Sequence, residues 1–337
     1  MDDVALLTLA ASLAARAGRG PVRALKRLEG GKNNRVFRVE TDAEPLALKL
    51  YHADPRDTRD RLGHEWSFLT HGWARGVRAI PEPLARDVTA HAGLYSFVGG
   101  DKLRPDQVTQ NHIDAALDFI LRINAPPRDI AALPQGSEAC FSLDQHLATV
   151  DRRVARLSDL DPHAPFGAEA AAFVRGSLAP VWREVRARID RDVRALGLDA
   201  ALAESEVCLS PSDFGFHNAL VEGGQMAFID FEYAGRDDPA KLASDFFCCP
   251  EIPAPVRYHG RFVDGLVAGL GLAPSHAERC RILLDAYRVK WSCIVLNDFL
   301  PLGADRRAFA DHAHTAERLK AQLDRAKASL DRIGSQA

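Results

Sequence analysis

The sequence predicts a two-lobed α+β fold, in which a small lobe with an antiparallel sheet precedes a larger, mainly helical lobe. A chain of 337 residues with 47% hydrophobic content can bury a large core, and this length favours two lobes. Short alternating segments and glycine-rich turns fill the first part of the chain, whereas apolar residues recur at helical spacing after Asp101. We therefore expect lobes over residues 1–98 and 99–337.

Composition narrows the classes of function. A net charge of −3 argues against a nucleic-acid-binding surface. No apolar run reaches the roughly 18 residues that a membrane span needs, and the acidic start Met1-Asp2-Asp3 lacks the basic region of a signal peptide. The six cysteines show no Cys-x-x-Cys spacing, and adjacent Cys248 and Cys249 in an apolar segment indicate buried thiols. We expect a cytoplasmic protein, monomeric or homodimeric, that binds neither nucleic acid nor membranes.

The first lobe is expected to begin with an amphipathic helix and to continue with strands. Strands are indicated where polar and apolar residues alternate, or where a short apolar run lies between turns. One further helix places Leu62, Trp66 and Leu69 on a single face. The expected elements are a helix over 4–15, strands over 22–28, 35–39 and 46–51, a helix over 59–70 and a strand over 91–98.

The second lobe shows helical periodicity over most of its length. Asp238 is well placed as an N-cap, and Asp245 on the helix that follows is expected to be structural. The last helix has an apolar stripe, including Phe309 and Leu323, which is more typical of packing on its own domain than of a dimer seam. The expected helices cover 113–124, 143–157, 168–196, 239–247, 255–271, 276–300 and 305–333.

Oxygen-bearing side chains gather between residues 209 and 235. Asp213 and Asn218 lie five apart in a loop, and a hairpin follows, with strands over 219–221 and 226–229 around a Gly-Gly turn. Asp230 stands where the second strand ends. Hard oxygens of this kind suit Mg²⁺, which takes few protein ligands and completes its octahedron with phosphate and water. Taken alone, the stretch is also consistent with a polar hairpin that carries two solvated carboxylates.

This stretch resembles the aminoglycoside phosphotransferase family of small-molecule kinases, including its choline-kinase-like relatives. The family reads His-Gly-Asp, four residues and Asn, then Ile-Asp-Trp/Phe-Glu and Gly-Asp-Pro; here the second block is Ile229-Asp230-Phe231-Glu232. The resemblance implies a protein-kinase-like fold with ATP and Mg²⁺ as cofactors. In that pattern Asp213 accepts the hydroxyl proton, while Asn218 and Asp230 hold the metals. Glu232, two residues beyond Asp230, is a candidate contact for the acceptor.

A glycine-rich turn precedes the second expected strand. Gly30 and Gly31 would let backbone N–H groups approach phosphate oxygens closely, and Asn33 and Asn34 would add donors. The equivalent loop of the resembling family covers the phosphates of ATP. It is not a Walker loop, because no Gly-Lys-Ser/Thr follows, and a plain hairpin turn is the alternative.

Lys49 lies in a predicted strand whose other residues are mostly apolar, which indicates that the strand is buried. Lysine is almost never fully buried without a partner. Glu65, on the following helix, could be that partner. A strand lysine paired to a helix glutamate and to nucleotide phosphates is the ion pair that an active kinase lobe needs. A lysine that extends to solvent from an edge strand is the alternative. By the same resemblance, Phe97 and Val98 are the nearest candidates for the hinge that pairs with the adenine edge.

The sequence departs from the family pattern just before Asp213. Pro211 and Ser212 replace the usual His and Gly. In the family pattern this His supports, or braces, the loop and does not touch the transferred phosphoryl group. Its replacement therefore removes a support and leaves the chemical groups in place. Ser210, Ser212 or His217 could brace the loop instead. The resemblance is specific over 29–65 and 209–245, and weak between 100 and 200, where the acceptor would lie.

The predicted function is an ATP- and magnesium-dependent kinase that phosphorylates a hydroxyl of a small molecule. Aminoglycoside, choline-like amine, amino alcohol and sugar all remain open as acceptors. A basic first lobe beside an acidic second lobe would suit an anionic nucleotide and a cationic or neutral acceptor, although chance scatter of charge explains the asymmetry equally well. The alternative is a nucleotide-binding pseudokinase without phosphotransfer, for which Pro211 is the support. A metal-dependent phosphatase would lack a nucleophile and would leave Lys49 unexplained.

Overall fold

The structure is a computed structural model that describes residues 2–28, 34–52, 59–301 and 315–334. The chain divides into two compact units, and each is described by itself. The first comprises Met1–Leu103, Asp118–Ser137 and Pro211–Arg236, and the second comprises Arg104–Leu117, Glu138–Ser210 and Asp237–Ala337. The predicted α+β class is confirmed, whereas a division after residue 98 stays a prediction.

The first unit contains a five-stranded antiparallel sheet in the order β1-β2-β3-β5-β4. Where the structure describes the turns between consecutive paired strands, over 42–45 and 88–91, they join short segments into hairpins. The strands are β1 (Val22–Leu28), β2 (Arg35–Thr41), β3 (Leu46–Leu50), β4 (Pro83–Asp87) and β5 (Ala92–Ser96).

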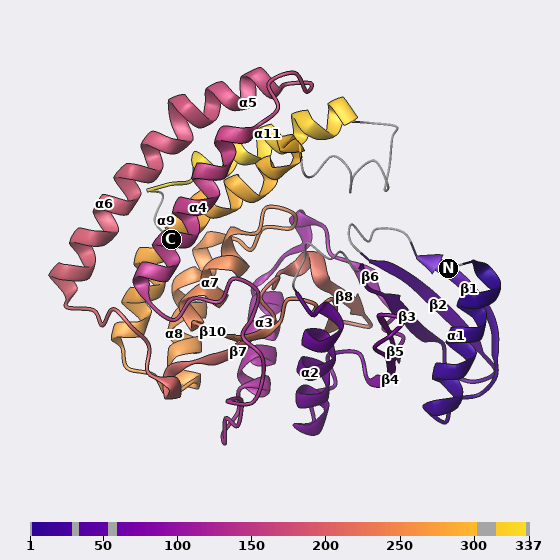
Figure 1. Cartoon of the computed structure of the whole chain (residues 1–337). Coiled ribbons are helices and arrows are strands. Elements are labelled where there is room, and N and C mark those ends of the chain that lie inside the picture. The colour runs from indigo at the N-terminus through magenta and orange to yellow at the C-terminus, as the bar shows by residue number, and fades with distance from the viewer. Residues whose placement is uncertain (1, 29–33, 53–58, 302–314, 335–337) are drawn as a thin grey trace. The chain divides into compact units, whose positions relative to one another are not determined.

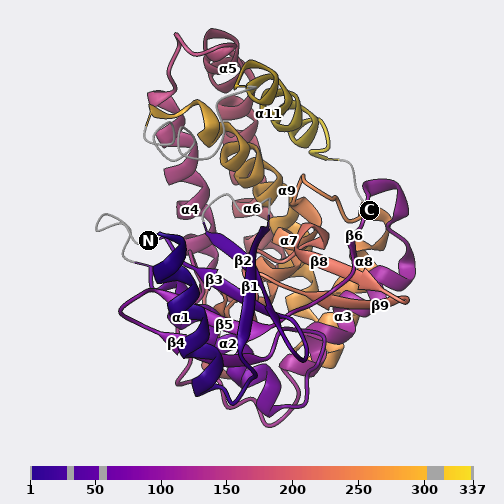
Figure 2. The same cartoon turned by 90° about the vertical axis from the view of Figure 1, so that its right-hand side faces the viewer.

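Two helices cover opposite faces of this sheet. Helix α1 (Asp3–Arg16) packs its apolar side on the face that carries Leu46, Leu48 and Leu50. Successive side chains of a strand point to opposite faces, so Lys49 points to the other face. There it meets helix α2 (Arg61–Ala74), which contacts β4 and β5. Figures 1 and 2 show α1 lying along the sheet. The sheet therefore isolates Lys49 from the apolar core beneath α1.

A second sheet of the first unit has the order β6-β8-β9, with β6 (Asp101–Lys102), β8 (Ala219–Glu222) and β9 (Gln225–Phe228). Glu222 pairs with Gln225, so the hairpin turn consists of Gly223 and Gly224 alone, and both have positive φ, 55° and 79°. A two-residue turn with this geometry matches the twist of the strands and favours glycine. The turn fixes the register that ends β9 immediately before Ile229 and Asp230.

The second unit is mainly helical, and helix α9 lies among the others: α4, α6, α7, α8 and α11 all contact it (Figure 1). Leu319, Leu323 and Leu330 of α11 are buried, and α11 contacts α9, which confirms that the described part of this stripe packs on its own domain; Phe309 lies outside the described residues. Two elements have residues in both units, α3 (Gln110–Ile123) and β10 (Gly235–Asp237). The other elements of the second unit are α4 (Leu143–Arg156), α5 (Gly167–Phe173), α6 (Ala179–Leu196), β7 (Cys208–Ser210), α7 (Pro239–Cys248), α8 (His259–Gly269), α9 (Ser275–Leu296) and α11 (Thr315–Leu330).

The single helix predicted over 168–196 is interrupted. A π-helical turn over Val174–Leu178 joins α5 to α6. Pro180 follows this turn and has no N–H for the bond to the carbonyl four residues earlier, which explains the local change of pitch. The helix predicted over 305–333 is observed as α11, and its first part lies outside the described residues.

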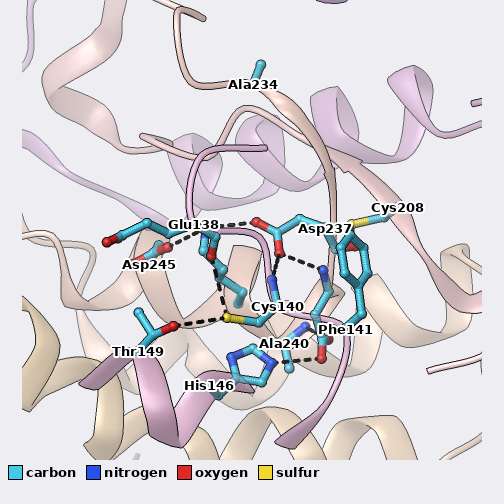
Figure 3. Close-up of polar contacts among 12 residues, drawn as sticks. Glu138, Cys140, Phe141, His146, Thr149, Cys208, Ala234, Asp237, Ala240 and Asp245 are labelled. Atoms are coloured by element: carbon cyan, nitrogen blue, oxygen red, sulfur yellow. Dashed lines mark hydrogen bonds and ion pairs between the residues drawn. The ribbon is translucent and has the colours of Figure 1, made fainter. Parts of the chain in front are cut away.

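A buried network of charged groups fixes the start of α7 (Figure 3). Asp237 accepts hydrogen bonds from the backbone N–H of Cys140 at 3.0 Å and of Asp238 at 2.9 Å, and it pairs with Lys241 at 2.8 Å. Asp238 caps the helix through the N–H of Ala240, as predicted. Buried charges are tolerated when each is paired and hydrogen-bonded, and this condition is met here.

Asp245 and the cysteines are also structural, as expected. The Asp245 carboxylate is buried and accepts from Lys290 at 2.8 and 3.0 Å and from Trp291 at 3.0 Å. All six cysteines are buried free thiols. Among the described residues, no helix is both long and apolar enough to cross a membrane.

The imidazole of His146 makes the stability of the second unit dependent on pH. Its Nε2 lies 2.9 Å from Asp238 and its Nδ1 lies 2.7 Å from the Tyr287 hydroxyl. Burial alone favours the neutral ring, but the hydrogen bond and charge of Asp238 outweigh it and raise the pKa of His146 to about 9. Because an unfolded histidine titrates near pH 6.5, the stabilisation is complete below about pH 6.5 and is lost as the pH rises through about 9.

We expect His146→Gln to remove this pH dependence. The wild type should lose roughly 3 kcal/mol of unfolding free energy between pH 6 and pH 9.5, since one pKa unit corresponds to about 1.4 kcal/mol. Urea unfolding followed by helical circular dichroism at both pH values measures the loss. An equal loss in wild type and variant would contradict the role of this imidazole.

Candidate active site

Lys49 stands at the centre of the charged groups of the first unit. Its Nζ lies 2.6 Å from the Glu65 carboxylate of α2 and 2.5 Å from the Asp230 carboxylate beyond β9. The side chains of Lys49 and Glu65 are 8% and 4% exposed, whereas that of Asp230 is 42% exposed. Despite burial, the attraction of Asp230 and Glu65 raises the pKa of Lys49. The ammonium is therefore held in its charged form between the buried carboxylate of Glu65 and the more exposed carboxylate of Asp230.

Two tyrosines complete the surroundings of Glu65. The Tyr51 hydroxyl donates to Glu65 at 2.8 Å and lies 2.7 Å from the Tyr95 hydroxyl. The Tyr95 side chain lies over Gly93, which is the cross-strand neighbour of Lys49. Only glycine leaves room for it, because a Cβ at residue 93 would lie 2.3 Å from the Tyr95 hydroxyl oxygen. Burial raises the pKa of Glu65, and the attraction of Lys49 offsets this rise only in part. The hydrogen bonds hold Glu65 in one position beside Lys49.

The loop that carries Asp213 is anchored by aromatic side chains. Phe214 and Phe216 are buried, and Phe214 packs against Phe119 and Phe228 at ring-centroid distances of 5.8 and 5.2 Å. Ser212, in the position of the family glycine, has a φ of 63°. This left-handed conformation costs an L-residue roughly 1–2 kcal/mol and explains why the pattern has glycine there. The side chain of Asp213, which follows, is 34% exposed, and its catalytic role stays a prediction.

Asn218 directly precedes β8 and Asp230 follows β9, so both lie at the open end of the hairpin. The Ile229 N–H donates to the Asn218 backbone oxygen at 2.9 Å, which brings Asp230 beside Asn218. The Asn218 Nδ2 donates to the backbone oxygen of Asp213 at 3.0 Å, so the Oδ1 is the atom that a cation would use. Asp230 has a φ of 68°. Strained non-glycine backbone of this kind concentrates at functional sites.

This donor set fits a magnesium ion that takes most of its ligands from phosphate and water. One carboxylate and one carboxamide oxygen are too few for a self-sufficient protein site. The described residues contain no group of three or more His, Cys, Asp or Glu that could hold a metal. Burial opposes ionisation of Asp230, but Lys49, with His217 and Arg61, lowers its pKa. The carboxylate is thus anionic and suited to a divalent cation.

Glu232 does not have the position expected of an acceptor contact. It is buried, and its Oε1 accepts from Arg61 of α2 at 2.9 Å while its Oε2 accepts from Asn34. Buried carboxylates are held by paired donors, and these partners occupy both oxygens. Glu232 therefore links Arg61 of α2 to Asn34, and the expected acceptor contact is corrected to a structural link.

Helix α2 contacts the whole segment after β9, with one side chain per turn. Beyond Arg61, the His64 Nδ1 bonds to the Ala234 backbone oxygen at 2.8 Å, and the Phe68 ring stacks on Phe231 with centroids 4.4 Å apart. Residues three or four apart share one helix face. The same face carries Glu65, so α2, Lys49 and the segment 230–234 form one continuous packed block.

The remaining predicted nucleotide contacts have different outcomes. Gly30, Gly31 and Asn33 lie outside the described residues. Asn34 is engaged with Glu232, and its Oδ1 accepts from the His52 N–H at 3.3 Å. Phe97 follows β5, and the Arg38 guanidinium lies 4.6 Å above its ring. Phe97 and Val98 are both half-buried, and their role as a hinge stays a prediction.

The sequence reasoning missed Arg61, His64, Tyr51 and Tyr95. One signal for Arg61 was present, because a cation in the first turn of a helix is unfavourable next to the positive end of the helix dipole. Such an arginine indicates an acidic partner elsewhere in the chain. No local pattern indicates the contact between the tyrosines, since Tyr51 follows β3 whereas Tyr95 lies with Gly93 in β5.

Comparisons with known proteins agree with this geometry. The sequence profile of the phosphotransferase enzyme family matches residues 24–283. A choline/ethanolamine kinase family protein from Mesorhizobium loti superposes with a TM-score of 0.56 at 19% identity, over 93% of each chain. Spectinomycin phosphotransferase APH(9)-Ia, in complex with ADP and spectinomycin, gives 0.60 at 14% identity over 98% of each chain. Choline kinase LicA from Streptococcus pneumoniae gives 0.59 at 13% identity, over 93% of this chain and 94% of that one.

These structures share the protein-kinase-like fold at low identity, and comparison with curated proteins gives no match. The family assignment rests on the profile, which spans well over half of the chain and includes every described residue of the charged site. The chain belongs to the phosphotransferase enzyme family.

Proposed function

We propose that the protein is an ATP- and magnesium-dependent kinase that transfers the γ-phosphoryl group to a hydroxyl of a small molecule. The observation that carries the proposal is the Lys49 ammonium, held between Glu65 and Asp230 in the unit that also carries Asp213 and Asn218. Family membership supports a phosphotransferase, and the neighbours named for spectinomycin and choline support a hydroxylated acceptor such as an aminoglycoside, amino alcohol, choline-like amine or sugar.

In this proposal Lys49 binds the nucleotide phosphates and Glu65 keeps its ammonium in place. Asp213 orients the acceptor hydroxyl and accepts its proton as the oxygen attacks the γ-phosphorus and the bond to the β-phosphate oxygen breaks. Phosphoryl transfer asks mainly for positioning and neutralisation of charge, and these fixed groups supply both. The buried hydrogen bonds of Glu65 limit the reorganisation needed during the reaction.

The charge balance of the site supports a metal requirement. Among the described residues of this site, the four carboxylates of Glu65, Asp213, Asp230 and Glu232 are accompanied by three permanent cations, those of Lys49, Arg59 and Arg61. A polyphosphate would meet an excess of negative charge here, and a bound magnesium ion would supply the missing positive charge. Asp230 and Asn218 are the residues that would hold it.

The test of the proposal is acceptor-dependent ADP release by the wild-type protein. A panel of aminoglycosides, amino alcohols, choline-like amines and sugars is incubated with ATP and Mg²⁺, and phosphorylated product is identified by mass spectrometry. At least one class should give stoichiometric ADP and phosphorylated acceptor. Nucleotide binding without product for any class would favour the pseudokinase.

Asp230→Ala should abolish the magnesium-dependent part of ATP binding, because the carboxylate that would join metal and phosphates is removed. Thermal-shift titration with ATP, with and without Mg²⁺, measures this part. The wild type should be stabilised more by ATP with Mg²⁺ than without, and the variant equally in both. Asp106→Ala removes an exposed carboxylate, 74% exposed, and is the matched control. Equal wild-type shifts in both conditions would contradict a metal site.

A further inference from the structure

His217 lies against the carboxylate of Asp213. Its Nε2 is 3.4 Å from the Asp213 Oδ1, and its side chain is 12% exposed, compared with 34% for Asp213. The imidazole is thus largely enclosed, while the carboxylate remains accessible. Catalytic hydrogen bonds are often long before substrate binds and shorten in the reacting complex, so this distance is within the useful range.

The fold of the loop explains why His217 reaches Asp213. Phe214 and Phe216 are both buried, which directs the residues beside them to the opposite side of the loop. A 3₁₀ turn over Phe216–Asn218, closed by the Asn218 N–H on the Gly215 oxygen at 3.1 Å, then folds His217 back toward Asp213. Asn218 fixes the other end through its 3.0 Å bond to the Asp213 backbone oxygen. Backbone and side chain of Asp213 are therefore held from the same turn.

The brace that the family pattern places before the aspartate is absent from this chain. Pro211 has neither a side-chain donor nor a backbone N–H. Of the three residues that could replace it, Ser210 is fully buried. Ser212 is buried, and its backbone has the left-handed conformation. His217 contacts the Asp213 carboxylate directly.

We propose that His217 is a positioning residue that orients the Asp213 carboxylate for the acceptor hydroxyl, replacing the missing brace from the opposite end of the loop. The inference rests on the proposed kinase function. It needs only an N–H at Nε2, which a neutral imidazole can carry. With Oδ1 held by His217, Oδ2 is the oxygen that accepts the acceptor proton.

The test compares His217→Gln with His217→Phe. Gln can place an amide N–H near the position of Nε2, whereas Phe keeps the ring volume without any donor. We expect Phe to lower kcat on the order of 10- to 100-fold, because a displacement of about 1 Å at a reacting group can cost about 100-fold. The KM for ATP should change little, and Gln should recover a large part of kcat. His163→Gln, at an exposed imidazole, is the matched control.

A double-mutant cycle tests whether His217 acts through Asp213 or only stabilises the fold of the loop. In an Asp213→Asn background, His217→Phe should cause little further loss of kcat, because residues that act as a unit are not additive. Equal losses in both backgrounds would overturn the inference, as would wild-type kcat in His217→Phe. A raised KM for ATP at unchanged kcat would also overturn it, since the imidazole would then serve the nucleotide. A wild type that phosphorylates no acceptor would instead refute the proposed function.

Discussion

Asp213→Asn is expected to lower acceptor-dependent turnover on the order of 10²- to 10⁴-fold while leaving nucleotide affinity near the wild-type value. A carboxamide has the shape of the carboxylate but does not accept a proton, and loss of one positioned general base has an effect of this size. The measurements are kcat from ADP release at saturating acceptor, and ATP affinity by calorimetry with Mg²⁺.

The fold around Asp213 makes this substitution specific. The Asn218 side chain bonds to the backbone oxygen of Asp213, so that contact survives the change of side chain. Phe214 and Phe216, which anchor the loop, are also untouched. The melting temperature should therefore stay close to that of the wild type. A collapse of ATP affinity together with the rate would show that Asp213 supports the loop and does not act on the acceptor.

Much of the fold could be predicted because its signals are local. The Gly223-Gly224 turn sets the hairpin, and Asp238 before Pro239 starts α7, as each was expected to do. The site order, with a strand lysine followed by a helix glutamate and then the Asp213 loop, is also readable along the chain. Each of these features depends on residues within one element or on elements in sequence order.

The contacts that hold the site could not be predicted in the same way. Arg61 and Glu232 are 171 residues apart, and their pairing depends on how α2 docks on the segment after β9. A shift of α2 by one residue would present another face, so the sequence of either element alone does not determine the pair. Glu232 was accordingly misassigned to the acceptor. The π-helical turn before Pro180 was missed because the apolar spacing on both sides remains helical.

Lys49→Ala is expected to weaken ATP binding and to abolish measurable acceptor-dependent turnover together. The substitution removes the Lys49 ammonium, which contacts both Glu65 and Asp230, and with it a positive charge for the phosphates. Lys49→Arg should restore little of the ATP binding or the turnover, because a planar guanidinium does not replace a compact ammonium in a buried site. ATP affinity by calorimetry and ADP release over the acceptor panel, with wild type and variants side by side, measure both effects.

Loss of Lys49 also has a structural consequence that must be separated from its chemistry. Removing one partner of a buried ion pair typically costs about 3–5 kcal/mol, since the Glu65 charge would remain buried beside Tyr51 without its cation. Lys49→Met combined with Glu65→Gln removes both charges at nearly constant volume and should recover most of the unfolding free energy lost in Lys49→Ala. If Lys49 acts on the phosphates, this double variant should be stable and still inactive. Recovery of turnover along with stability would show that the ion pair serves the fold alone, and the kinase mechanism proposed for Lys49 would then be wrong.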